Sequence, residues 1–122
     1  ASGMTDITGF GLLGHAHEMA SQAEVDFEFE FDKLPLLPGA DQHAQASVFP
    51  GGTWRNLNHF DPHVTFGETV EDWQKNLLWT PETSGGLLVA VPPENVDNFI
   101  KYCPDSTVVG VVRKGNGSII VR

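Results

Sequence analysis

Asp6 is the side chain in this sequence best placed to do chemistry, because it precedes an apolar segment that carries Gly9, Gly11 and Gly14. A carboxylate is a hard oxygen ligand suited to Mg²⁺, which takes one or two protein carboxylates and fills its shell with water and phosphate oxygens. The same carboxylate could instead cap the helix that follows, by accepting hydrogen bonds from unpaired N–H groups at its N-terminus. The residues leave both interpretations open, and a metal site would need further ligands from outside this chain.

The three glycines are unusual in the first turns of a helix. Leu12, Leu13, Ala16, Met19 and Ala20 recur at the spacing of one buried face, so we expect a helix over residues 8–22. Each interior glycine costs a helix roughly 0.5–1 kcal/mol relative to alanine. Such glycines indicate a backbone that something must approach closely.

A second candidate site comprises Thr83, Ser84, Gly85 and Gly86. Two hydroxyl groups and two permissive glycines stand directly before an apolar run. Successive backbone N–H groups in such a turn can form a concavity that binds an anion. A tight turn without a ligand is the alternative.

A third candidate lies in residues 50–56. Arg55 offers a guanidinium fork suited to phosphate or carboxylate, and Thr53 and Asn56 could add hydrogen bonds. Trp54 could seal the loop or stack on a ligand. The alternative is a surface loop that Trp54 anchors.

The histidines and the cysteine predict no catalytic nucleophile. His15 and Glu18 could pair at a spacing of three residues, while His15 and His17 point to different sides of a helix. The single cysteine, Cys103, precedes Pro104 at an expected helix end, so packing is the simpler interpretation. The histidines without ligand spacing on one helical face are His15, His17, His43, His59 and His63.

The remaining pattern predicts an α+β fold, a mixed β-sheet flanked by helices. Phenylalanines alternate with acidic residues over 24–32, which predicts a strand with one buried face and one acidic face toward water or a partner. A long loop is expected over 48–67, and Asn116-Gly117 indicates a closing hairpin between strands at 107–113 and 118–122. We expect further helices near 39–47, 68–78 and 92–102 and a strand over 87–91.

Composition limits the classes of protein that fit. The chain has 122 residues, enough for one domain, and 16 acidic against 7 basic residues give a formal charge of −9. This charge argues against binding nucleic acid, and a bound nucleotide would need a divalent cation or a basic neighbour. No apolar run is long enough for a membrane span, and one cysteine with no visible secretion signal suggests the cytoplasm. The start at Ala1, close to the richest motif, suggests a piece of a longer polypeptide.

Four strings in order resemble the C-terminal domain of selenophosphate synthetase (selenide, water dikinase), a family of the aminoimidazole ribonucleotide synthetase superfamily. They are Thr5-Asp6-Ile7-Thr8-Gly9-Phe10-Gly11-Leu12-Leu13-Gly14-His15, Leu34-Pro35-Leu36-Leu37-Pro38-Gly39, Pro50-Gly51-Gly52-Thr53-Trp54-Arg55-Asn56 and Pro81-Glu82-Thr83-Ser84-Gly85-Gly86-Leu87-Leu88. Each alone identifies little, but together they span nearly the whole chain. Glu82 stands where many relatives have glutamine.

The resemblance implies that residues 1–122 are one domain of a two-domain enzyme, with a fold like the superfamily's C-terminal domain. It implies Mg²⁺-dependent conversion of ATP, selenide and water to selenophosphate, AMP and phosphate. Asp6 would help bind the magnesium, and Thr83, Ser84, Gly85 and Gly86 are hypothetical ATP-binding residues.

By the same resemblance, the absent N-terminal domain would supply the reactive cysteine or selenocysteine, a lysine, further metal-binding aspartates and most ATP contacts. Cys103 does not match that reactive position, so we expect this chain alone to be inactive. The full-length enzyme would be a cytoplasmic homodimer.

Two alternatives remain. One is another enzyme of the superfamily, a thiamine-phosphate kinase or a hydrogenase-maturation ATPase. The other is a non-catalytic interaction module that uses the acidic strand face.

Overall fold

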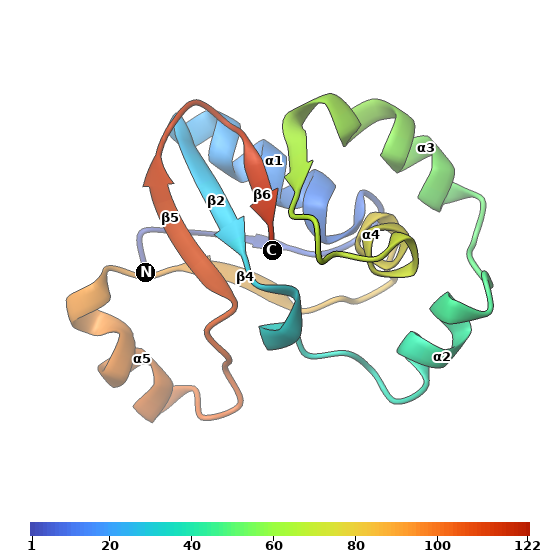
Figure 1. Ribbon diagram of the computed structural model, residues 1–122. Helices are drawn as coiled ribbons and strands as arrows, with labels where there is room; N and C mark the ends of the chain where they lie inside the picture. The colour runs from blue at the N-terminus through green and yellow to red at the C-terminus, as the bar shows by residue number, and fades with distance from the viewer.

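The computed structural model describes residues 1–122 and has an α+β fold (Figure 1). The strands are β1 (Gly3–Asp6), β2 (Val25–Phe29), β3 (Val64–Phe66), β4 (Leu87–Ala90), β5 (Gly110–Lys114) and β6 (Ile119–Val121). The helices are α1 (Gly11–Ala23), α2 (Ala40–Gln45), α3 (Gly52–Phe60), α4 (Asp72–Trp79) and α5 (Val96–Tyr102). A four-stranded sheet has the order β3–β6–β2–β5, and β1 and β4 form a separate antiparallel ribbon. The predicted fold class is confirmed, since β2 runs parallel to β6 and antiparallel to β5.

Helix α1 lies between the two sheets. It contacts β2 and β6 on one side and β1 on the other, and the β1–β4 ribbon crosses behind the larger sheet in Figure 1. Leu13, Ala16 and Ala20 are fully buried, as the periodicity predicted. On the ribbon side, Met19 Cε packs against Gly3. The first strand itself was not predicted.

Two glycines of α1 are explained by contacts within the chain. Gly11 has φ +68°, and a Cβ there would lie 2.9 Å from the carbonyl oxygen of Thr80. A Cβ on Gly14 would lie 2.6 Å from Cβ of Phe10 and 2.8 Å from Cε2 of Phe60. The backbone that approaches Gly11 is therefore the C-terminal end of α4 with Thr80, and the ring that approaches Gly14 is Phe60 of α3. The predicted start at residue 8 is wrong, because residues 7–10 form a connection before the helix.

The predicted closing hairpin is wrong. β5 and β6 do not pair with each other, because β2 lies between them. The intervening turn crosses the first residues of β2: Gly117 N donates to Val25 O at 2.8 Å, and Asp26 Oδ1 accepts from the amides of Asn116 and Ser118 at 3.0 and 2.9 Å. The chain does turn at Asn116-Gly117, but the turn packs around the end of β2 instead of joining two paired strands.

The predicted loop over residues 48–67 is also wrong, because it contains α3, a 3₁₀ turn at Asp61–His63 and β3. Proline and glycine residues precede and follow α3 rather than interrupt it. Its buried positions are Thr53, Asn56 and Phe60, of which two are polar. A polar buried face conceals the helical period, which sequence analysis reads from apolar residues.

The acidic strand is confirmed as β2, with Phe27 and Phe29 buried. Its acidic side is partly occupied by the chain's own cations: the two oxygens of Glu28 accept from Nε of Arg113 and of Arg122, each at 2.6 Å. These hydrogen bonds, first that of Arg113, lower the pKa of Glu28. The strand ends at Phe29, and Phe31, which is still buried, begins a 3₁₀ turn.

The other predicted elements are confirmed with shifted ends. α4 begins at Asp72 rather than near residue 68, because Glu71 and Gln74 form a capping box there. A 3₁₀ turn at Pro93–Asn95 leads into α5. None of these helices combines the length and apolar character that crossing a membrane requires.

Replacing Gly14 by alanine should lower the free energy of unfolding by about 1–3 kcal/mol, because the new methyl group would collide with Phe60 in a packed interior. Gly9→Ala is the matched control. No atom lies within 4 Å of its Cβ position and its φ is not positive, so its effect should stay within about 0.5 kcal/mol. Urea denaturation measures both, and equal stabilities of the two variants would contradict this account of Gly14.

Candidate functional site

The structure brings two of the predicted site segments together. Asp6, the last residue of β1, lies opposite Leu87, the first residue of β4. Beyond the strands the pairing continues: Ile7 N donates to Gly86 O at 2.9 Å, Gly85 N to Ile7 O at 2.9 Å, and Glu82 N to Thr8 O at 3.0 Å. The segment after Asp6 therefore runs alongside the turn at residues 83–86.

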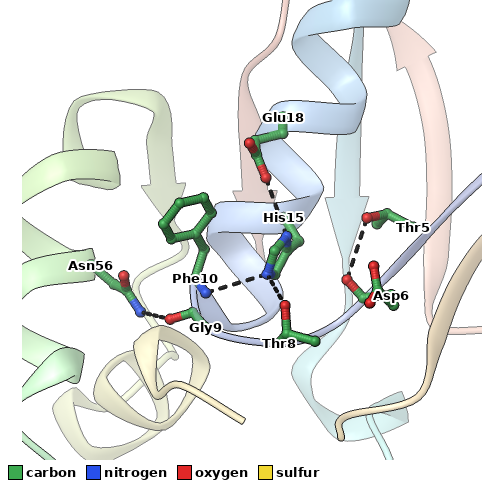
Figure 2. A network of polar contacts seen from close by, with 8 residues as sticks. All are labelled: Thr5, Asp6, Thr8, Gly9, Phe10, His15, Glu18 and Asn56. Atoms are coloured by element: carbon green, nitrogen blue, oxygen red, sulfur yellow. Dashed lines mark hydrogen bonds and ion pairs between the residues drawn. The ribbon is translucent and has the colours of Figure 1, made fainter. Parts of the chain in front are cut away.

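Asp6 does not cap α1, so that interpretation is wrong. The residue that caps α1 is Phe10, which gives no side-chain hydrogen bond, and the amide of Gly11 bonds to Thr8 O at 3.0 Å. Asp6 is exposed at the end of the ribbon. Its hydrogen bond from Thr5 Oγ1, 3.3 Å long, goes to its backbone carbonyl (Figure 2). The carboxylate thus remains available to a ligand.

A single free carboxylate fits one position in the shell of a hard cation such as Mg²⁺. No group of three or more histidine, cysteine, aspartate or glutamate side chains in the structure could hold a metal ion. Asp6 could therefore serve only as one ligand among several, the others coming from substrate, water or another part of the protein.

The turn at residues 83–86 offers less to an anion than the sequence suggested. The N–H of Gly85 is already bonded to Ile7, so it does not point toward a ligand. Gly85 must lack a side chain because a Cβ there would overlap the Glu82 carboxylate and lie 2.9 Å from Ile7, and Gly86 has φ +84°. Thr83 and Ser84 are exposed beside the Asp6 segment. Their hydroxyls, and the amides of Thr83, Ser84 and Gly86, which form no hydrogen bond within the protein, are the groups of this turn that could meet a phosphate.

Glu82 is a carboxylate whose surroundings disfavour its charge. Its Oε2 lies close to the position that a Cβ on Gly85 would occupy, although the residue as a whole is exposed. Loss of water around this carboxyl raises its pKa above the ordinary value of 4.5. No salt bridge in the structure compensates it.

His15 holds the connection between Asp6 and α1 (Figure 2). Its Nε2 accepts from the amide of Phe10 at 3.3 Å and lies 2.9 Å from Thr8 Oγ1. Since a backbone amide can only donate, Nε2 carries the lone pair, and Nδ1–H donates to Glu18 Oε1 at 3.2 Å. The predicted pairing of His15 with Glu18 is confirmed, but its larger role, fixing residues 8–10, was missed.

Asn56 of α3 holds the same connection from the other side. Its Nδ2 donates to Gly9 O at 3.0 Å (Figure 2). The same Nδ2 donates to Trp79 O at 2.8 Å, and the residue is buried. Thr53 is fully buried and donates to Thr80 Oγ1 at 3.2 Å. Both side chains are thus engaged inside the protein. Of the predicted donors in residues 50–56, Arg55 alone is exposed and unpaired by any acid.

An open pocket of about 370 Å³ between α1 and α3 was not predicted. His17 closes one side: its ring stacks on His63 with centroids 4.0 Å apart, and its Nδ1 lies 2.8 Å from Gly117 O. Desolvation first, and then the neighbouring His17 and His59, lower the pKa of His63. The lining residues are Phe10, His17, Glu18, Ser21, Gln22, His59 and Phe60. The stacked rings of His17 and His63 therefore contribute packing. The sequence had shown no metal-ligand spacing among the histidines, and it gave no sign of this stacking.

Comparison with known proteins agrees with the fold and the motifs. All of residues 1–122 match the family described as AIR synthase related protein, C-terminal domain, and this chain belongs to that family. Among curated proteins it is 41% identical to selenide, water dikinase of Carboxydothermus hydrogenoformans, over 99% of this chain and 36% of that protein. It is 37% identical to the selenide, water dikinase of Pseudomonas straminea, over 97% and 34%. The resemblance to selenophosphate synthetase is thereby confirmed, and the chain spans about a third of the length of these relatives.

Substituting His15 by phenylalanine should free the connection that carries Asp6. The ring is retained but the acceptor for the Phe10 amide is lost, so this amide should exchange with solvent faster and stability should fall by about 1–2 kcal/mol. Hydrogen exchange followed by NMR measures the effect at Phe10. Glu18→Gln, which keeps an oxygen for Nδ1–H, is the control and should leave the exchange at Phe10 unchanged. Unaltered exchange in His15→Phe would contradict the assigned role.

Glu82→Gln should stabilise the protein in a pH-dependent way. Because the pKa of Glu82 is raised in the folded state, the folded protein binds more protons there than the unfolded chain, and stability falls as pH rises above 4.5. The glutamine side chain of the variant does not ionise, so the variant does not lose this stability as the pH rises. The stability difference between variant and wild type should therefore be small at pH values below 4.5 and grow above it. Denaturation curves over a pH series test this, and a pH-independent difference would refute it.

Proposed function

We propose that this chain is the C-terminal domain of a selenide, water dikinase, which converts ATP, selenide and water to selenophosphate, AMP and phosphate. The observation that carries the proposal is Asp6: its motif matches this family, and its carboxylate is exposed and free of protein partners. The names of the relatives support the assignment of the parent enzyme. The single cysteine fits a reducing compartment, and we place the enzyme in the cytoplasm.

In this proposal Asp6 binds Mg²⁺ together with phosphate oxygens of ATP and ligands from the rest of the enzyme. Phosphoryl transfer depends mainly on positioning and on neutralising charge, and magnesium supplies that positive charge. A positive charge is required here, because a chain with a formal charge of −9 would otherwise repel a triphosphate. The chain's own contribution is to hold one oxygen ligand in a fixed direction.

Thr83 and Ser84 are the proposed ATP contacts of this domain. They are exposed and follow Glu82, whose amide bonds to Thr8, two residues after Asp6. Hydroxyl groups at this distance along the paired segments could donate to phosphate oxygens of a nucleotide that shares the Asp6 metal. Gly85, whose amide is bonded to Ile7, contributes by shaping the turn, and Gly86 supplies the positive φ that the turn requires.

In the full-length enzyme, Asp6→Asn should reduce selenide-dependent AMP formation by roughly two orders of magnitude or more, as expected when a group that stabilises transferred charge is lost. Its thermal unfolding in the absence of ATP and Mg²⁺ should be nearly unchanged, since the exposed carboxylate forms no hydrogen bond or salt bridge within the domain. Asp105→Asn, at an exposed aspartate distant in sequence, is the matched control. Near-normal AMP formation by Asp6→Asn would refute the proposal, and formation of ADP in place of AMP would indicate a sister enzyme of the superfamily.

A further inference from the structure

Arg55 is the one arginine of this chain that no acid neutralises. The other two arginines, Arg113 and Arg122, both bind the carboxylate of Glu28. Arg55 is exposed on α3, and its guanidinium forms no salt bridge and no hydrogen bond within the protein. In a chain with a formal charge of −9, such a free guanidinium is available to an anion from outside the domain.

The contacts of Gly52 show where this guanidinium lies. A Cβ on Gly52 would lie 3.4 Å from Nη2 of Arg55 and 2.6 Å from Cγ of Pro81. Arg55 therefore folds back along the first turn of α3, as long helical side chains do, and its guanidinium lies on the side of α3 that meets Pro81. The absence of a side chain at Gly52 is what lets the start of α3 approach the chain that leaves α4.

Two hydrogen bonds fix the position of α3 against this chain. Thr53 Oγ1 donates to Thr80 Oγ1 at 3.2 Å, and Asn56 Nδ2 donates to Trp79 O at 2.8 Å. Thr53 and Asn56 are both buried, so solvent does not compete for these bonds. The helix therefore holds the guanidinium near the turn at residues 82–86, although the guanidinium has no partner of its own.

Arg55 and Asp6 lie at opposite ends of residues 81–87. Asp6 is opposite the last residue of this segment, and the guanidinium is beside the first. Between the two ends, Thr83 and Ser84 expose hydroxyls and amides that form no hydrogen bond within the protein. A cation held by Asp6 and the guanidinium would place positive charge on both sides of these donors. This arrangement suits a ligand that carries several phosphate groups.

We propose that Arg55 is a phosphate-binding residue, which holds a phosphate group over Thr83 and Ser84 at the end of the turn remote from Asp6. A guanidinium presents a planar fork of N–H donors that matches two oxygens of one phosphate, so it also fixes the direction of the group that it binds. The proposal rests on the proposed function for the source of the phosphate, which is the nucleotide. Inorganic phosphate released by the reaction has the same chemistry.

Calorimetric titration of the full-length protein tests this assignment, with ATP and magnesium as one probe and inorganic phosphate as the other. Arg55→Gln should weaken the binding of ATP roughly tenfold or more, as expected when a hydrogen bond to a charged group is lost. Arg55→Lys keeps the charge but loses the fork, so its binding should be intermediate. Lys101→Gln, which removes an exposed charge from α5, is the matched control and should bind ATP as the wild type does.

The two probes separate the two sources of phosphate. Weaker binding of ATP to Arg55→Gln assigns Arg55 to the nucleotide. Weaker binding of inorganic phosphate, with unchanged binding of ATP, assigns it to the released phosphate. Unchanged binding of both probes would overturn the proposal, and so would the failure of the wild type to bind either.

Two further measurements distinguish ligand binding from a structural role. The unfolding temperature of ligand-free Arg55→Gln should equal that of the wild type, because the side chain is exposed and unpaired. In steady-state kinetics the KM for ATP should rise by a larger factor than kcat falls, since Asp6 is unaltered. A lower unfolding temperature together with weaker binding would mean that Arg55 supports the fold, which would contradict the assignment.

The failure of this proposal differs from the failure of the proposed function. If the wild type forms no AMP in response to selenide but Arg55→Gln still weakens the binding of ATP, the phosphate site stands and the proposed function fails. If selenide-dependent AMP formation is found and Arg55→Gln binds both probes as the wild type does, the proposed function stands and the role of Arg55 is overturned.

Discussion

The antiparallel pairing of residues 7–8 with residues 82–86 is the constraint on which the candidate site depends. Ile7 is buried and exchanges backbone hydrogen bonds with Gly85 and Gly86. Side chains alternate along an extended chain, so burying Ile7 turns Asp6 outward. A carboxylate held in this way has a fixed direction, although it makes no bond of its own, and the absence of a side chain at Gly85 is what allows the two segments to approach.

The glycines that open α1 serve this same geometry. In the sequence they suggested a backbone that a ligand approaches closely. In the structure, a Cβ at Gly11 would collide with the carbonyl groups at the end of α4, and a Cβ at Gly14 would collide with the ring of Phe60. With Asn56 bonded to both Gly9 and Trp79, α1, α3 and α4 meet around the connection that follows Asp6. The local helix stability that the glycines give up is recovered as close packing, which fixes the position of the site rather than forming its surface.

Local pattern predicted local structure well and long-range pairing poorly. Alternation of phenylalanine with acidic residues identified β2, because one face of that strand is buried and apolar. The hairpin failed because the insertion of β2 between β5 and β6 is decided by contacts about ninety residues apart, including those of Asp26. α3 was missed because Thr53 and Asn56 are buried polar residues. The pairing of residues 7–8 with residues 82–86 is also between segments far apart in the sequence, so no local signal could show that Asp6 lies near the 83–86 turn.

The electrostatics around the end of the β1–β4 ribbon favour a nearby cation. Asp6 and the desolvated Glu82 lie on paired segments of a strongly acidic chain, so covering them without a cation would be unfavourable. The carboxylate of Asp6 is exposed and has no hydrogen-bond or salt-bridge partner in the domain, so a cation that meets it would offset this local negative charge.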